Sequence, residues 1–172
     1  ASHGEAVRVV RLDLSSGRSS AFTDGPLTYD SPDVARSESR ITFVASSYGN
    51  PAEVYVTGLD AFEPTRLTDT NPEIGALDFP TAEHITWAAP DGATIHGLLV
   101  KPPDFDPSRR YPMITIPHGG PASAVGEGFW GMTFYNPYRD DLLAARGFLV
   151  LQPNPRGSGG FGYDPHVLVP GT

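Results

Sequence analysis

Four consecutive residues, His118-Gly119-Gly120-Pro121, constrain the fold of this 172-residue chain more than any other feature. They directly follow the short apolar run 111–117, which has the pattern of a buried strand. Glycine adopts backbone dihedrals that other residues rarely reach, and proline has no N–H to continue a ladder of hydrogen bonds. The sequence therefore predicts a buried strand that ends in a tight, glycine-rich turn.

A turn of this kind is suited to binding a developing negative charge. In acyl transfer the carbonyl oxygen becomes negative in the tetrahedral intermediate, and backbone N–H groups aimed at that oxygen stabilise it. Gly120 is the best candidate donor, because Pro121 has no N–H. His118 and Gly119 complete the candidate oxyanion loop, in which we expect His118 to support the turn and not to move protons. An ordinary Gly-Gly turn is the alternative.

A helix and a second buried strand are predicted after the turn. Asn136 suits the N-cap of the helix, Pro137 its first position, and Gly147 the left-handed residue that follows its end. Residues 148–151 then form another apolar run. The order strand, glycine turn, helix, strand is typical of a mostly parallel sheet.

A second motif, Asn154-Pro155-Arg156-Gly157-Ser158, comes directly after that strand. We expect Arg156 to be a structural anchor near the site, because a guanidinium can bond several carbonyls or a carboxylate at once. Ser158 is not expected to be a nucleophile, since its surroundings lack the Gly-x-Ser-x-Gly spacing of a nucleophile elbow.

Together, His-Gly-Gly-Pro and Asn-Pro-Arg-Gly-Ser-x-Gly-aromatic-Gly, in this order, resemble the prolyl-oligopeptidase family of serine peptidases, above all its acylaminoacyl-peptidase and bacterial dipeptidyl-peptidase-like members. The resemblance covers roughly residues 82–163. It implies an α/β-hydrolase domain that cleaves short peptides or acyl-peptides by a Ser-Asp-His triad. It also implies that the Gly120 N–H is one oxyanion donor and that the residue after the nucleophile supplies the other.

The first half of the chain is punctuated by glycine and proline, which number 19 and 18 in the whole sequence. It also repeats itself weakly: Val9 matches Val54, and Phe22-Thr23-Asp24 matches Leu67-Thr68-Asp69, about 45 residues further on. A period of about 40–50 residues with several short strands is typical of a β-propeller blade. A plain β-meander is the alternative.

We therefore expect an α/β fold, a partial α/β-hydrolase sheet preceded by β-propeller blade strands. Residues 1–70 are predicted to be the end of a propeller, about one and a half blades, and residues 71–81 a linker. Residues 82–172 are predicted to be the N-terminal part of the catalytic domain, which is incomplete.

No Gly-x-Ser-x-Gly occurs in the sequence. We expect the nucleophile, the acid and the base of the triad to be absent, so that this chain alone is inactive. The last stretch, 164–172, also departs from the helical continuation that the resemblance implies. An esterase or other acyl hydrolase of the same fold, and a non-enzymatic β-rich binding module, are the alternatives.

The composition of the chain limits the classes of partner that it is expected to bind. The net charge of −8 without a basic stripe argues against nucleic acid, and no apolar run approaches the roughly 18 residues of a membrane span. The chain has no cysteine and no His-x-x-x-His, so we expect no metal site and no cofactor. A peptide substrate of the full-length enzyme is the expected partner. We expect a soluble protein, cytoplasmic or periplasmic, whose oligomeric state the sequence does not fix.

Overall fold

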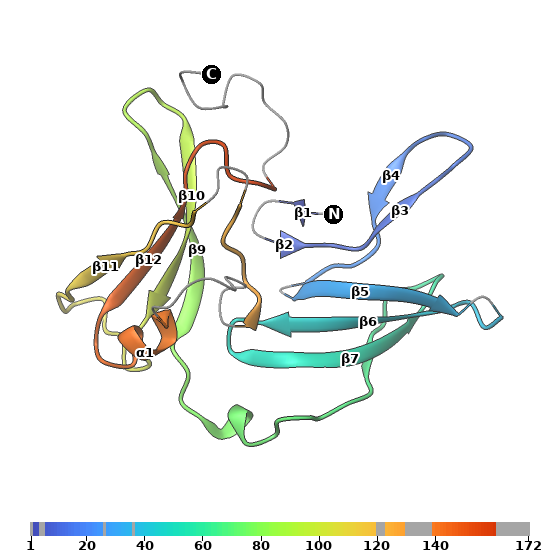
Figure 1. Ribbon diagram of the computed structural model, residues 1–172, viewed down its shortest axis with the longest axis horizontal. Helices are drawn as coiled ribbons and strands as arrows, with labels where there is room; N and C mark the ends of the chain where they lie inside the picture. Colours follow the sequence, from blue (N-terminus) through green and yellow to red (C-terminus); the bar gives the residue numbers. More distant parts are fainter. Residues whose placement is uncertain are drawn as a thin grey trace.

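The computed structural model describes residues 2–3, 6–25, 27–35, 37–119, 123–129 and 139–160 (Figure 1). Strands are the main regular structure of these residues, and they are arranged in several sheets. One short α-helix and one 3-10 turn are the helical elements among them. None of the helices in this part of the chain is both long and apolar enough to cross a membrane.

The first half contains three antiparallel sheets. Two are two-stranded, β1 with β2 and β3 with β4, and one has the order β5-β6-β7-β8. The strands are β1 (Ser2–His3), β2 (Ala6–Val7), β3 (Val10–Leu12), β4 (Ser19–Ala21), β5 (Thr28–Ala35), β6 (Arg40–Ser47), β7 (Asn50–Gly58) and β8 (Thr65–Arg66). A four-stranded sheet whose strands follow one another in sequence order is the arrangement of a propeller blade.

The predicted internal repeat is a repeat of structure as well as of sequence. The Val9 N–H donates to Thr23 Oγ1 at 3.1 Å, and the Val54 N–H donates to Thr68 Oγ1 at 2.9 Å. In each unit the residue before the threonine returns a backbone hydrogen bond to the same valine carbonyl, at 2.9 Å in the first and 2.8 Å in the second. The hairpin β3–β4 is therefore the counterpart of β7–β8.

Aromatic rings form the core of the four-stranded sheet. Phe43 on β6 is 1% exposed and lies with its ring centroid 5.4–6.0 Å from those of Tyr29, Tyr55 and Phe62. Residues along β6 alternate between buried and less buried positions, as expected of a strand with one face on a core. This cluster of rings holds one face of the sheet together.

Glu53 is a carboxylate buried in the same sheet. It is 6% exposed on β7 and accepts hydrogen bonds from the Thr68 hydroxyl, from the Thr70 N–H at 2.8 Å and from the Thr70 hydroxyl at 3.0 Å. The Thr68 hydroxyl above all, then Thr70 and the Arg66 charge, hold the pKa of Glu53 below its ordinary value. The ionised carboxylate therefore stabilises the fold.

Glu53→Gln is expected to destabilise the protein at neutral pH and to matter less in acid. A depressed pKa contributes stability that is present above the unfolded pKa of about 4.3 and is lost as the pH falls through the lower folded pKa. The difference in unfolding free energy between wild type and Glu53→Gln should thus shrink as the pH is lowered. Denaturant titrations at several pH values measure it, with the exposed Glu63→Gln as control. A difference independent of pH would contradict the assignment.

The second half contains another four-stranded sheet, in which parallel and antiparallel pairs are mixed and the strand order is β11-β12-β10-β9; it is called the second sheet below. Its strands are β9 (Thr81–Ala88), β10 (Thr94–Lys101), β11 (Met113–Thr115) and β12 (Leu149–Asn154). The pair Asp91-Gly92, which is typical of hairpin turns, joins β9 to β10, with Gly92 at a φ of +86°. Strand β11 pairs with β12 in parallel, as predicted, but β10 pairs antiparallel with both β12 and β9. The expectation of a mostly parallel sheet is therefore wrong for the described strands, because the hairpin β9–β10 makes up half of them. Leu98, Val100 and Val150 of this sheet are completely buried, and they form one apolar cluster with Tyr48, Val125 and Ala144.

The predicted helix exists but begins later than expected. Helix α1 runs from Asp140 to Ala144, and its N-cap is Arg139, not Asn136. Asn136 and Pro137 lie outside the described residues. Buried side chains fix the start of α1: Asp140 accepts a 2.5 Å hydrogen bond from Gln152 of β12. Gly147, with a φ of +88°, ends the turn after α1 as predicted.

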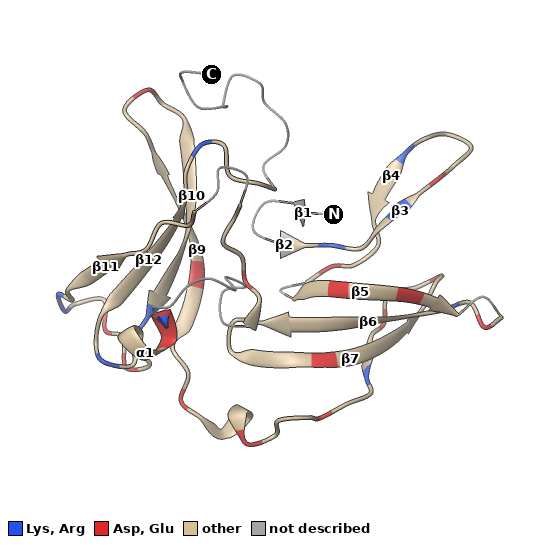
Figure 2. Cartoon of the chain, in the orientation of Figure 1, with Lys and Arg blue, Asp and Glu red and all other residues tan. Residues whose placement is uncertain are grey.

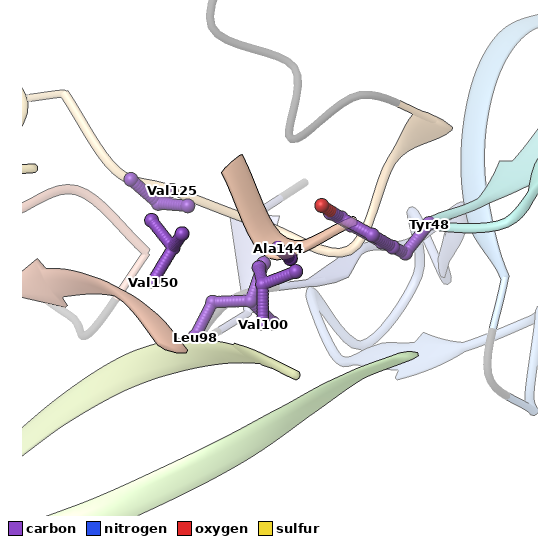
Figure 3. Packing of buried hydrophobic residues seen from close by; sticks show 6 residues of the cluster. All are labelled: Tyr48, Leu98, Val100, Val125, Ala144 and Val150. Atoms are coloured by element: carbon purple, nitrogen blue, oxygen red, sulfur yellow. The ribbon is translucent and has the colours of Figure 1, made fainter. Parts of the chain in front are cut away.

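The two halves of the chain touch through the β6–β7 turn. Tyr48 in this turn is 6% exposed and packs into the core of the second sheet with Leu98, Val100 and Ala144 (Figure 3). The neighbouring Ser46 Oγ accepts a 3.3 Å hydrogen bond from the Phe129 N–H. The connection between the sheets contains the 3-10 turn η1 (Ile74–Ala76). Contact between the two halves is therefore direct and partly apolar.

Candidate functional site

The candidate oxyanion loop leaves the end of β11, which lies at one edge of the second sheet among the described strands. The Ile116 N–H donates to the Leu151 carbonyl at 2.8 Å, which continues the β11–β12 pairing beyond the strand. His118 follows and is partly buried, whereas Gly119 is exposed. Gly120, the predicted donor, and Pro121 lie outside the described residues. The structure therefore fixes where this loop starts.

His118 contacts the second motif, 40 residues away in sequence. Its Nε2 lies 2.8 Å from Ser158 Oγ, and its Nδ1 lies 3.2 Å from the Gly119 carbonyl oxygen. Ser158 Oγ also lies 2.6 Å from the Pro155 carbonyl oxygen. The two motifs predicted to belong to one site are thus in direct contact.

The direction of these hydrogen bonds follows from their partners. A carbonyl oxygen can only accept, so the 2.6 Å contact between Ser158 and Pro155 requires the hydroxyl proton to lie between them. With that proton directed at Pro155, the Ser158 oxygen is the acceptor for a proton on His118 Nε2. We assign the ring proton there because the 2.8 Å contact is shorter than the 3.2 Å contact of Nδ1 with the Gly119 carbonyl. A ring nitrogen that already holds a proton cannot take one from serine. The arrangement supports the loop and is not a nucleophile activated by a base.

A fluorophosphonate probe is expected to leave Ser158 unlabelled. Such probes need an activated serine, and the Ser158 hydroxyl donates its proton to a carbonyl. Peptide mapping by mass spectrometry after exposure to the probe measures this, and a fully denatured sample gives the background. A Ser158 adduct above that background would contradict the assignment of the hydrogen bonds.

Asn154, the last residue of β12, binds the chain that follows the glycine turn. It is 3% exposed. Its Oδ1 accepts from the Val125 N–H at 2.7 Å, and its Nδ2 donates to the Val125 carbonyl at 2.9 Å. The Gly159 N–H also donates to the Ser123 carbonyl at 3.0 Å. Segment 123–125 is therefore held against the turn 154–159.

Arg156 lies at the surface, in an ion pair with Asp91 of the β9–β10 turn. Both side chains are about half exposed, at 51% and 53%. The Ala93 N–H first, and then Arg156, hold the pKa of Asp91 below its ordinary value. Arg156 therefore joins its own turn to the neighbouring hairpin, at a distance of 65 residues in sequence.

The sequence did not single out Asn154 or Ser158 as contacts of the loop. The available signal was their position, since polar residues directly after a buried strand have few partners except at that edge of the sheet. The sequence also did not single out the pair Gln152 and Asp140, although both side chains are buried and hydrogen-bonded to each other. Figure 2 marks acidic residues on α1, whose first turn contains the buried Asp140 and Asp141. In the part of the chain that the structure describes, no three His, Cys, Asp or Glu side chains gather into a metal-binding group.

No protein-family model matches the chain, but curated relatives do. It is 32% identical over 146 residues to a probable dipeptidyl-peptidase 5 of Aspergillus niger. The aligned region covers 82% of this chain and 19% of that protein. The chain is also 32% identical over 115 residues to an uncharacterised peptidase of Bacillus subtilis, which covers 66% of this chain and 16% of that protein. The chain thus spans less than a fifth of these relatives' length.

The fold has a counterpart among solved structures. Pyrococcus horikoshii acylaminoacyl peptidase superposes with a TM-score of 0.73 over 96% of this chain and 24% of its own, at 24% sequence identity. The match extends over both sheets, since it covers nearly the whole chain.

Proposed function

Since this chain belongs to the prolyl-oligopeptidase family of peptidases, we propose that it is part of a serine-type peptidase that hydrolyses short peptides or acyl-peptides. The observation that carries the proposal is the contact between its two motifs. The His118 ring meets Ser158 of the Asn-Pro-Arg-Gly-Ser motif, so both lie at one end of the second sheet.

We propose the following division of the chain. Residues 1–70 form the end of a β-propeller, residues 71–81 a linker, and residues 82–172 the N-terminal part of an α/β-hydrolase catalytic domain. The repeated valine–threonine hydrogen bond supports the first assignment, because it relates two units about 45 residues apart. The parallel pairing of β11 with β12, with α1 between them in sequence, supports the assignment of residues 82–172.

In the proposed mechanism the chain stabilises charge and supplies no nucleophile. The Gly120 N–H donates to the oxyanion of the tetrahedral intermediate, His118 and Gly119 shape the loop, and Arg156 anchors the turn beside it. The second donor is the N–H that follows the nucleophile. The serine, the aspartate and the histidine of the triad come from residues outside this sequence, so the isolated chain is inactive.

Hydrolysis of matched amide and ester substrates tests this function. A longer protein that contains this chain is incubated with a dipeptide or acyl-amino-acid p-nitroanilide and with the corresponding ester. We expect turnover of the amide, abolished by a fluorophosphonate, and none by the isolated chain. Turnover of the ester alone would favour the esterase alternative. Turnover of neither, by a folded protein, would favour a binding module.

A further inference from the structure

We propose that Ser158 and Asn154 are positioning residues that hold His118 and Val125, the described residues on either side of the proposed oxyanion donor Gly120, against the turn 154–159. The inference rests on the proposed function, because it assigns a role in the same reaction. Neither side chain is proposed to touch the substrate. Each acts through the backbone or side chain of the residue that it holds.

His118 is held by a chain of two hydrogen bonds. His118 donates from Nε2 to Ser158 Oγ at 2.8 Å, and Ser158 donates to the Pro155 carbonyl at 2.6 Å. Ser158 is 8% exposed, so water competes little for its hydroxyl. The Ser158 N–H donates to the same carbonyl at 3.0 Å, which fixes the turn that presents the hydroxyl. The position of the imidazole is therefore set by the turn 155–158.

The Asn154 side chain holds Val125. Its carboxamide makes a reciprocal pair with the N–H and the carbonyl of Val125, whose side chain is 1% exposed. All of these groups are buried, so losing the carboxamide leaves two backbone groups without a partner or admits water. The hydrogen bond from the Gly159 N–H to the Ser123 carbonyl adds a further attachment close to Val125 in sequence. His118 and Val125 are thus both bound to residues 154–159.

Holding both residues matters for catalysis because an oxyanion donor works by being in place before charge develops. A preorganised N–H costs no reorganisation during the reaction, and small displacements of a reacting geometry are costly in rate. The charge exists in the intermediate and its transition state, not in the bound substrate. Loosening either attachment should therefore lower kcat and leave KM nearly unchanged.

The test uses a longer protein that contains this chain, with Ser158→Ala and Asn154→Ala made separately. Each is expected to lower kcat about tenfold, as the loss of ~1.4 kcal/mol of transition-state stabilisation would, and to change KM less than about twofold. Ser20→Ala, an exposed serine on β4, is the matched control and should keep both constants. An unchanged kcat in Ser158→Ala, which removes a single oxygen atom, would refute the inference.

Amide hydrogen exchange gives a readout that does not need activity. Peptides that span residues 123–126 should exchange faster in Asn154→Ala than in wild type, because the Val125 N–H loses its acceptor. Unchanged exchange there would overturn the role of Asn154, even if the protein proves to be no peptidase. Faster exchange in a protein that cleaves neither amide nor ester would keep the attachment and reject the proposed function. If Asn154→Ala does not fold, Ser158→Ala decides the question through its kcat.

Discussion

Phe43→Ala is expected to lower the free energy of unfolding of the four-stranded sheet by about 3–5 kcal/mol. The Phe43 ring is 1% exposed and contacts three other aromatic rings, two of them on neighbouring strands. Removing the ring leaves a cavity whose lining cannot close, because the strands on both sides are paired to β6. Denaturant unfolding followed by near-ultraviolet circular dichroism, which reports on aromatic packing, measures the effect.

An exposed position on the neighbouring strand gives the control for this prediction. Val34 on β5 is 48% exposed, so Val34→Ala removes methyl groups that are largely in water. We expect a change below about 0.5 kcal/mol. Equal losses in Phe43→Ala and Val34→Ala would mean that the ring cluster is not the core of this sheet.

Tyr48→Ala should have an effect of similar size, but on the other sheet. Tyr48 belongs to the β6–β7 turn, and its ring is buried among Leu98, Val100 and Ala144. Burial first, and then the charge of Asp140, raise the pKa of Tyr48, so the hydroxyl stays protonated. Truncation is expected to cost about 3–5 kcal/mol of unfolding free energy, as for other buried aromatic residues. Fluorescence of Trp87 on β9, recorded in a Trp130→Phe background so that it is the single tryptophan, follows the unfolding of the sheet concerned.

Tyr48→Phe separates the ring from the hydroxyl. The Tyr48 hydroxyl faces the buried Asp140 carboxyl, and hydrogen bonding to Asp140 contributes to its raised pKa, but the contact does not have the geometry of a well-formed hydrogen bond. Removal of the hydroxyl should therefore change the unfolding free energy by less than about 1 kcal/mol. A loss in Tyr48→Phe as large as that in Tyr48→Ala would show that the hydroxyl, and not the apolar ring, joins the two halves of the chain.

The sequence predicted those parts of the fold that depend on local pattern. The Asp91-Gly92 hairpin, the left-handed Gly147 and the parallel pairing of β11 with β12 follow from turn chemistry and apolar runs. The repeat of Val9 and Thr23 at Val54 and Thr68 was visible because a side chain replaces a backbone partner in both units. Each of these features is specified by residues close together in sequence or by a fixed spacing.

Strand β5 was missed because its own residues argue for a turn. Ser31 and Pro32 interrupt the strand, and the pairing with β6 shifts register between Asp30 and Asp33, with Ser31 at a φ of +48°. A bulge on an edge strand accommodates both residues without ending the strand. Only the long partner strand β6 makes this visible, and the sequence of β5 carries no record of it.

The contacts at the candidate site were missed for a different reason. His118 meets Ser158 across 40 residues, and Asn154 meets Val125 across 29. Residue type alone does not pair such groups, because their meeting depends on the order of strands in the sheet. Arg156 was predicted as an anchor from its chemistry, but its partner, Asp91, is known only from the position of the β9–β10 turn.

The hydroxyl that closes each repeated unit gives a rule for finding further units in longer, more divergent chains. In both units a threonine stands 14 residues after the valine whose N–H it accepts, and the preceding residue completes the pair of bonds. Only an oxygen acceptor is required there, so serine can substitute and valine cannot, although valine has the same shape. Searching for a hydroxyl at that spacing, repeated about every 45 residues, should reveal related segments whose overall identity is too low to align.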